Sequence, residues 1–157
     1  MKKYKIKYKE MNRLNPSSIS PFLGTDIGCF ALTELAHGSN VKDIQTTAVF
    51  DSQSNQFILN TPTDMAMKFW IGNAGEIANT SVVFAQLLIN DKNYGVHGFI
   101  VPLRNKNHDV FPGLVIGDCG EKIGLNGIDN GFLIFKNYRI PKENFLDRFS
   151  KISENGE

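Results

Sequence analysis

Residues 82–88 of the chain read Val-Val-Phe-Ala-Gln-Leu-Leu, and the turn-like sequence Asn90-Asp91-Lys92-Asn93 follows almost at once. On periodicity alone this apolar run could be a buried helix. It is shorter than an ordinary buried helix and is bounded by a turn signal, so we predict a strand. After the linker at residues 15–21 the pattern is mostly that of β-strands.

The sequence on both sides of this run carries further strand signals. Residues 46–50 and 56–60 are rich in β-branched and aromatic side chains and flank the polar stretch 51–55, as in a hairpin. Further strands are predicted at residues 66–71, 81–89, 95–101, 114–116 and 132–135. Short apolar runs between turn signals are typical of a closed or sandwiched sheet, so we predict an all-β fold.

The composition is that of one ordinary soluble domain, with 157 residues of which 41% are hydrophobic and 21% charged. With 17 basic and 16 acidic side chains the net charge is +1, which points to neither a nucleic-acid nor an anionic-membrane partner. No run approaches the roughly 18 apolar residues that span a bilayer, and we see no secretory signal. We therefore expect an intracellular protein, although its last residues lack a Ser-Lys-Leu type of peroxisomal address.

The N-terminal residues differ from the rest of the chain. In residues 4–9 lysine alternates with tyrosine and isoleucine, which fits either an edge strand that docks on a partner or a mobile charged tail. Residues 15–21 are rich in proline and serine and are typical of a linker. We therefore divide the chain into a basic segment with its linker (1–20), a β-domain (21–150) and a polar tail (151–157).

The cysteines and histidines show no pattern for nucleophilic or metal chemistry. Cys29 and Cys119 lie far apart without metal-ligand spacing, so we predict reduced, buried thiols and no metal site. His37, His97 and His108 are scattered, and no serine or cysteine stands in a nucleophile motif. We predict no catalytic residue, and we interpret His97 as a hydrogen-bonded core or interface residue.

Three segments could contact a ligand. The glycine-rich run 120–131 has the spacing of neither a Walker loop nor a Rossmann turn, so we interpret it as tight turns and bulges. In residues 33–40 a polar turn follows the strand-like stretch 29–32, and this turn could bind a heteroaromatic or phosphate-bearing ligand or could be an ordinary loop. In residues 68–73 the only tryptophan, Trp70, precedes a glycine turn; it could form a flat ligand-binding wall or belong to the core.

Several short motifs, taken in order, resemble the acyl-CoA oxidase family, long-chain type, within the superfamily of flavin-dependent acyl-CoA dehydrogenases. They are Cys29-Phe30-Ala31-Leu32-Thr33-Glu34-Leu35, His37-Gly38-Ser39-Asn40-Val41, Thr46-Thr47-Ala48, Trp70-Ile71-Gly72-Asn73, Val96-His97-Gly98-Phe99-Ile100-Val101-Pro102, Leu125-Asn126-Gly127-Ile128-Asp129-Asn130-Gly131 and Arg139-Ile140-Pro141. Spaced motifs in family order are far more specific than any one alone. The resemblance implies the family's middle-domain β-barrel, which holds FAD against an α-helical core.

The resemblance also implies the site residues. Thr33 matches the threonine that hydrogen-bonds the flavin, Trp70 matches the tryptophan beside the ring system, and Ser39 matches a serine that touches the CoA moiety in related dehydrogenases. Gly72 stands where dehydrogenases commonly carry threonine and oxidases glycine, and the smaller residue could leave room for oxygen. The cofactor-binding residues implied in this way are Phe30, Leu32, Thr33, Gly38, Trp70, Ile71 and Gly72.

In the family reaction a carboxylate removes the α-proton of a fatty acyl-CoA while hydride passes to the flavin, and oxygen then reoxidises the flavin to give hydrogen peroxide. The family's glutamate base belongs to a C-terminal helical domain, and Glu34, in the flavin-site motif, does not take that role. We therefore expect the middle domain of an FAD-dependent, peroxisomal acyl-CoA oxidase that is not catalytic alone. Helical domains or other subunits would complete it in an oligomer or larger assembly. The alternative is a non-catalytic assembly module derived from such a domain.

Overall fold

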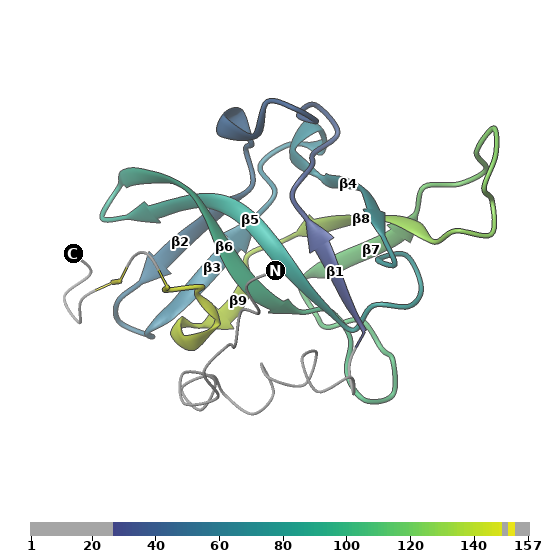
Figure 1. Ribbon diagram of the computed structural model, residues 1–157. Helices are drawn as coiled ribbons and strands as arrows, with labels where there is room; N and C mark the ends of the chain where they lie inside the picture. The colour runs from purple at the N-terminus through teal and green to yellow at the C-terminus, as the bar shows by residue number, and fades with distance from the viewer. Residues whose placement is uncertain (1–26, 149–150, 153–157) are drawn as a thin grey trace, which may run out of the picture.

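The computed structural model describes residues 27–148 and 151–152, and within these ranges it contains strands and three short 3-10 helices but no α-helix (Figure 1). This confirms the prediction of an all-β fold. No helix in the described ranges could cross a membrane. The predicted basic strand, the linker and most of the polar tail lie outside the described residues.

Nine strands make up the fold. Their bounds are β1 (Gly28–Ala31), β2 (Thr47–Asp51), β3 (Gln56–Asn60), β4 (Lys68–Gly72), β5 (Thr80–Ile89), β6 (Lys92–Pro102), β7 (Leu114–Asp118), β8 (Asn130–Phe135) and β9 (Tyr138–Pro141), and the 3-10 helices are η2 (Val41–Asp43), η3 (Asp64–Ala66) and η4 (Lys142–Asn144). Every strand predicted within the described residues is confirmed, and most have shifted ends. The strand predicted from residue 66 begins at Lys68 because η3 occupies the residues before it.

The apolar run at residues 82–88 lies in β5, which forms the longest hairpin with β6. The loop consists of Asn90 and Asp91, both with positive φ (49° and 62°), as a type I′ hairpin turn requires. Asn and Asp tolerate this conformation better than other non-glycine residues. The choice of strand over helix is therefore confirmed, and the turn is tighter than predicted because Lys92 already pairs with Ile89.

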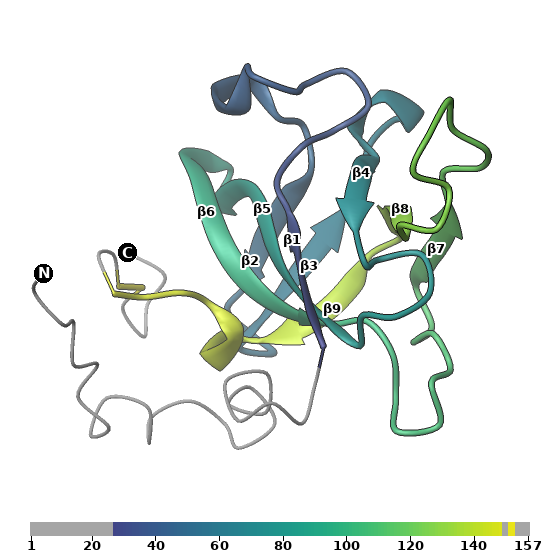
Figure 2. The same ribbon diagram turned by 45° about the vertical axis from the view of Figure 1, so that its right-hand side comes forward.

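Two sheets make up the domain. In the larger one the strand order is β1-β5-β2-β3-β9, with β6 on the other edge of β5. β1 and β2 both run parallel to β5, one beside its first half and one beside its second. This sheet curls into half a barrel (Figure 2). The smaller sheet, β4-β8-β7, is antiparallel, and its β4 lies next to β1.

The space between the sheets is filled by one hydrophobic core. Along β3 and β8, buried and half-buried residues alternate, so each strand presents one face to this core. Phe57 packs at its centre with its ring 5.0 Å from that of Phe99 and 5.7 Å from that of Phe145. Both sheets contribute to the core, so neither can move far without opening a cavity.

Two details differ from the sequence analysis. β9 was not predicted, because a four-residue strand that contains Arg139 and Pro141 offers too little apolar pattern; it is fixed by antiparallel pairing with β3. Cys29 and Cys119 are free thiols, as predicted, but both are half-buried instead of buried.

Candidate functional site

The chain leaves β1 along the outer side of the molecule. Phe30 is 59% exposed even though it lies within β1, and its ring is 5.0 Å from that of Phe84. Leu32 and Thr33, which follow the strand, are half-buried. An apolar surface therefore runs along the exit from β1, and Thr33 adds a polar group to it.

Gly38 and Ser39 lie at the exposed end of the polar turn. A Cβ added to Gly38 would meet nothing within 4 Å, so this backbone is open to close approach. The Ser39 carbonyl accepts a hydrogen bond from the Val41 N–H at 3.0 Å, just before η2. The predicted contacts of Gly38 and Ser39 thus lie on an accessible loop.

Trp70 faces outwards because β4 is irregular at this point. The register of β4 against β8 shifts between Lys68 and Ile71, and Trp70 has a φ of +63°. A bulky aromatic residue rarely adopts this conformation, which costs on the order of 1–3 kcal/mol. The bulge leaves Trp70 54% exposed and Ile71 2% exposed. The Trp70 indole can therefore contact a ligand, whereas Ile71 can offer only its backbone.

Hydrogen bonds join the two candidate segments directly. The Phe69 N–H donates to the Thr33 carbonyl (3.1 Å), and the Thr33 hydroxyl donates to the Phe69 carbonyl (2.8 Å). The Leu35 N–H donates to the Met67 carbonyl (3.0 Å). The structure thus brings Thr33 beside the residue that precedes Trp70. The Thr33 hydroxyl proton is engaged with the Phe69 carbonyl, but the hydroxyl oxygen keeps its lone pairs. Thr33 can therefore accept a hydrogen bond from a ligand N–H but cannot donate one.

A buried ion pair lies beneath this junction. Lys68 Nζ lies 3.0 Å from Glu34 Oε1, and both side chains are fully buried. The Glu34 carboxylate also accepts hydrogen bonds from the Gln45 N–H (2.7 Å), the Thr46 N–H (2.8 Å) and the Thr46 hydroxyl (2.6 Å). His37 Nδ1 lies 3.3 Å from Glu34 Oε2. Sequence analysis missed this pair, although a lysine directly before the apolar run Phe-Trp-Ile was a signal.

The environment changes the pKa of both partners. Burial raises the pKa of the Glu34 carboxyl, but the Lys68 charge and the donors from Thr46 and Gln45 outweigh burial, so the pKa lies below its usual value. Burial lowers the pKa of Lys68 to about 8, and the Glu34 charge opposes this shift. At pH 7 the pair is therefore charged. Glu34 cannot act as a solvent-facing base, because its carboxylate is enclosed and fully occupied.

The lowered pKa of Glu34 predicts a loss of stability in acid. The folded protein favours the charged form of this carboxylate more strongly than the unfolded chain does. Its contribution to the free energy of unfolding is therefore complete above the unfolded pKa of about 4.3, and it disappears as the pH falls through the lower pKa of the folded state. Urea unfolding of the full chain at a series of pH values should reveal the decline.

Asp51, whose pKa is lowered to about 2 by hydrogen bonds from Ser54 and Arg139, adds a separate acid dependence. In the double variant Glu34→Gln/Lys68→Met, the acid dependence of stability that comes from Asp51 remains, and the part that comes from Glu34 is absent. The difference between the two curves therefore isolates Glu34. Identical slopes in wild type and double variant would contradict the assignment.

The turn that follows Gly72 is held from two sides. The Asp129 carboxylate accepts hydrogen bonds from the N–H groups of residues 75–77 at 2.9, 2.9 and 3.1 Å. The buried Arg104 guanidinium donates to carbonyls of the same turn, at residues 74, 75 and 78. Sequence analysis assigned no role to either residue, although Arg104 stands two residues after the end of β6. Together they fix the backbone next to the exposed indole.

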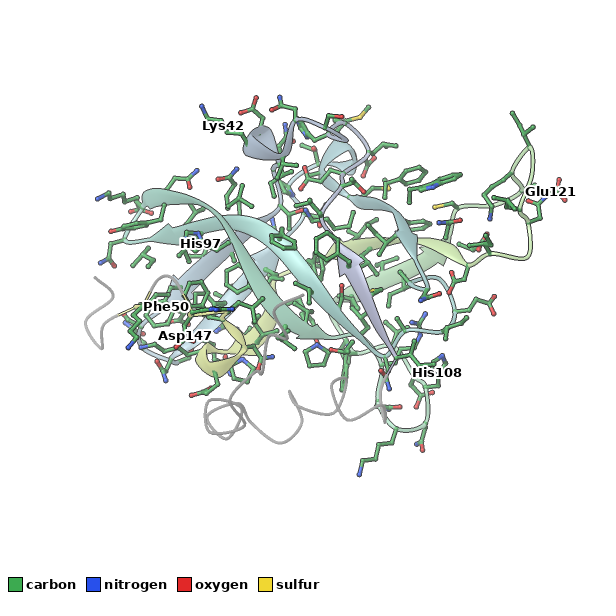
Figure 3. All side chains as sticks on the ribbon, in the orientation of Figure 1. Lys42, Phe50, His97, His108, Glu121 and Asp147 are labelled. Carbon is green, nitrogen blue, oxygen red and sulfur yellow. The ribbon has the colours of Figure 1, made fainter. Side chains whose placement is uncertain are left out.

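An open pocket lies between Trp70 and the loop that connects β7 to β8. Its lining includes Cys119, Lys122, Leu125 and Ile128. Figure 3 shows Glu121 on this projecting loop, remote from Phe50 and Asp147 at the opposite end of the molecule. The loop contains Gly120 with a φ of +82°, which agrees with the interpretation of the glycine-rich run as turns. Trp70 is thus accessible from this side as well.

The histidines do not form a site together. His97 Nδ1 lies 3.1 Å from the Gly95 carbonyl, and its ring lies 5.6 Å from that of Phe145, which agrees with the sequence interpretation. His97 lies in β6, whereas His108 lies far from it on a loop (Figure 3). Among residues 27–148 and 151–152, no group of three or more His, Cys, Asp or Glu could hold a metal ion.

Comparison with solved structures defines the class of this domain. It matches acyl-CoA oxidase 1 of Arabidopsis thaliana with a TM-score of 0.85 and 41% identity, over 94% of this chain and 24% of that one. It matches acyl-CoA oxidase-1 of Caenorhabditis elegans, complexed with FAD and ATP, with a TM-score of 0.84 and 41% identity, over 95% and 24% of the two chains. The class is therefore the β-domain of acyl-CoA oxidases.

The chain belongs to the family of the acyl-CoA dehydrogenase middle domain, whose model matches residues 29–138. Among curated proteins it is 51% identical to acyl-coenzyme A oxidase 4 of Candida tropicalis over 130 residues, which are 83% of this chain and 18% of that protein. It is also 49% identical to peroxisomal acyl-coenzyme A oxidase 3 of Arabidopsis thaliana. That match covers 129 residues, or 82% of this chain and 19% of that protein. The chain thus spans about a fifth of these relatives.

Proposed function

We propose that this chain supplies one wall of a flavin site in an FAD-dependent acyl-CoA oxidase. The whole protein would oxidise the α,β-bond of a fatty acyl-CoA with oxygen as the final acceptor. The observation that carries the proposal is the junction of Thr33 with the Phe69 carbonyl and N–H, which places the Thr33 hydroxyl beside the residue that precedes the exposed Trp70. The relative from Caenorhabditis elegans complexed with FAD supports the choice of cofactor.

The residues at this junction fit a flat heteroaromatic ring. The exposed indole of Trp70 and the ring of Phe30 offer apolar surface that would exclude water from one side of the ring. The Thr33 hydroxyl oxygen would accept a hydrogen bond from a ring N–H, and the open backbone at Gly72 permits close approach. Bound FAD would accept the hydride. Ser39, on the exposed loop, would contact the CoA part of the substrate.

The residues of this chain would bind and orient, but would not remove the substrate proton. Glu34 is enclosed by its ion pair with Lys68 and by the donors from residues 45 and 46, so it has no access to a ligand. As the family resemblance implies, the base would then belong to another domain or subunit. Such a partner would also cover the apolar surface around Phe30 and Trp70. The peroxisomal names of the curated relatives support a peroxisomal location.

An ultraviolet–visible spectrum of the native assembly purified from its source tests this proposal. We expect flavin absorption that bleaches when a long-chain acyl-CoA is added without oxygen, and peroxide production in air. The isolated chain should produce no peroxide. A colourless assembly would contradict the proposal and favour a non-catalytic assembly module.

Gly72 offers a test of oxygen access in the intact oxidase. A Cβ at Gly72 would meet nothing within 4 Å, so Gly72→Thr should leave the fold intact while it narrows the space beside the flavin. We expect flavin reoxidation by oxygen to slow by about tenfold, or about 1.4 kcal/mol in the barrier. Stopped-flow absorbance of the reduced enzyme mixed with oxygen measures this rate. Gly127→Ala, at an exposed glycine that does not line the pocket beside Trp70, is the control, and unchanged reoxidation in Gly72→Thr would refute the idea.

A further inference from the structure

We propose that the buried ion pair of Lys68 and Glu34 is a positioning element that holds Thr33 and Trp70 in a fixed relation to each other. This inference rests on the proposed function for its meaning, since Thr33 and Trp70 are the two proposed ring contacts. Neither Lys68 nor Glu34 would touch the cofactor. They would act through the backbone of the two segments that carry the contact residues.

Lys68 fixes the backbone on both sides of Thr33. Its Nζ donates to the Leu32 carbonyl at 3.0 Å and to Glu34 Oε1 at 3.0 Å. One ammonium group therefore holds the residue before Thr33 and the residue after it. The only isolated bridge between the polar turn and β4 also pairs Glu34 with Lys68. Thr33 is thus clamped in register with Phe69.

The same lysine fixes the start of the bulge that turns Trp70 outwards. In a regular strand Lys68 and Trp70 would share one face, because side chains alternate. Here Lys68 is fully buried and Trp70 is exposed. Trp70 has a φ of +63°, and the next residue, Ile71, is buried again. The unfavourable backbone conformation persists only if both flanks are held. Lys68 holds one flank through its ion pair, and Ile71 holds the other through the core.

Glu34 connects this junction to a third segment. Its carboxylate accepts hydrogen bonds from the N–H groups of Gln45 and Thr46, next to β2. The exit of β1, the start of β2 and β4 are therefore tied to a single carboxylate. A buried ion pair is weak evidence for stability, because the cost of removing two charges from water offsets their attraction. Apolar side chains could fill this volume, but they could not hold the Leu32 carbonyl.

The double variant Glu34→Gln/Lys68→Met tests the inference in the full 157-residue chain, because it removes both charges and leaves neither one unpaired. Hydrogen exchange by NMR reports on the Leu35 and Phe69 amides, which form the ladder between the two segments. We expect both to exchange about tenfold faster than in the wild type, since hydrogen bonds to charged groups are the stronger ones. Fluorescence anisotropy of Trp70, the only tryptophan, should fall.

Asp51→Asn/Arg139→Gln is the matched control, since it neutralises an exposed ion pair of the same 3.0 Å length. It should leave the Leu35 and Phe69 amides and the Trp70 anisotropy unchanged. Urea unfolding of every variant separates local from global effects. Unchanged exchange at Leu35 and Phe69 in the folded double variant would overturn the inference. So would an acceleration spread equally over β2 and β3, because it would mean a role in stability alone.

If the double variant does not fold, Thr46→Val provides the test, because it removes one hydroxyl donor from Glu34 without touching a charge. We then expect exchange at Leu35 and Phe69 to quicken by about threefold, and no change there would overturn the inference. In the assembled protein, the double variant should bind FAD about tenfold more weakly with an altered flavin spectrum. Absence of flavin in the wild-type assembly would defeat the proposed function, while the exchange and anisotropy results would still decide the positioning role.

Discussion

Lys68→Met is expected to destabilise the full chain by about 3–5 kcal/mol, the largest loss among the substitutions considered. The change removes the buried Lys68 ammonium from Glu34, whose carboxylate keeps the donors from Gln45 and Thr46 and the contact with His37 Nδ1 at 3.3 Å. Methionine matches the lysine stem in length, so the loss reports the missing ammonium group, with its bonds to Glu34 and to the Leu32 carbonyl, and not a cavity. Urea unfolding followed by circular dichroism measures the difference.

A second substitution, Glu34→Gln, shows how much of this loss comes from the unpaired charge and how much from packing. Adding Glu34→Gln to Lys68→Met removes the unpaired carboxylate, so the double variant is expected to be more stable than the Lys68→Met single variant. If the double variant is less stable than that single variant, the buried charge is not the cause. Asp51→Asn, at the exposed pair with Arg139, should change the free energy of unfolding by less than about 1 kcal/mol.

Gly131→Ala is expected to cost about 3 kcal/mol, at the upper end for overpacking. A Cβ at Gly131 would lie 2.7 Å from Gly75 Cα and 2.9 Å from the Ala74 carbonyl carbon, and these backbone atoms cannot rotate away. The clash would push the turn of residues 73–78 off the Asp129 carboxylate. Chemical unfolding should therefore occur at a clearly lower urea concentration.

Gly127→Ala is the natural control, because a Cβ at Gly127 would meet nothing within 4 Å. We expect it to change stability by less than about 0.5 kcal/mol. Equal stabilities of the two alanine variants would show that the turn can move away from β8. If the protein is the proposed oxidase, Gly131→Ala should also weaken FAD binding in the assembly, since the displaced turn follows directly after Gly72.

Much of the fold could be predicted from local sequence. The hairpin of β2 and β3 follows from two β-rich segments around a polar stretch, and β5 follows from a short apolar run that ends in Asn90-Asp91. These signals are local, because a turn and an alternating pattern need only neighbouring residues. β9 could not be predicted in this way, since its pairing with β3 supplies what its own four residues lack.

The supports of the candidate site could not be predicted, because each joins residues far apart in the sequence. Lys68 contacts Glu34 across 34 positions, and Asp129 contacts the turn after β4 across more than 50. A charged side chain in isolation reads as a solvated surface group. Only when the strands are in register does burial force these charges to find partners.

The sequence by itself determined the all-β class and the family, since ordered motifs and strand patterns are written in consecutive residues. It also singled out Thr33, Trp70 and Gly72 as proposed ring contacts. The tertiary structure decided how these residues are presented to a ligand. The bulge exposes Trp70 while it buries the neighbouring Ile71. The Thr33 hydroxyl already donates to the Phe69 carbonyl, so it can only accept a hydrogen bond from a ligand. The reason is physical, because a bulge depends on how β4 pairs with β8 and on the buried charge beneath it, and neither is encoded in the motif alone.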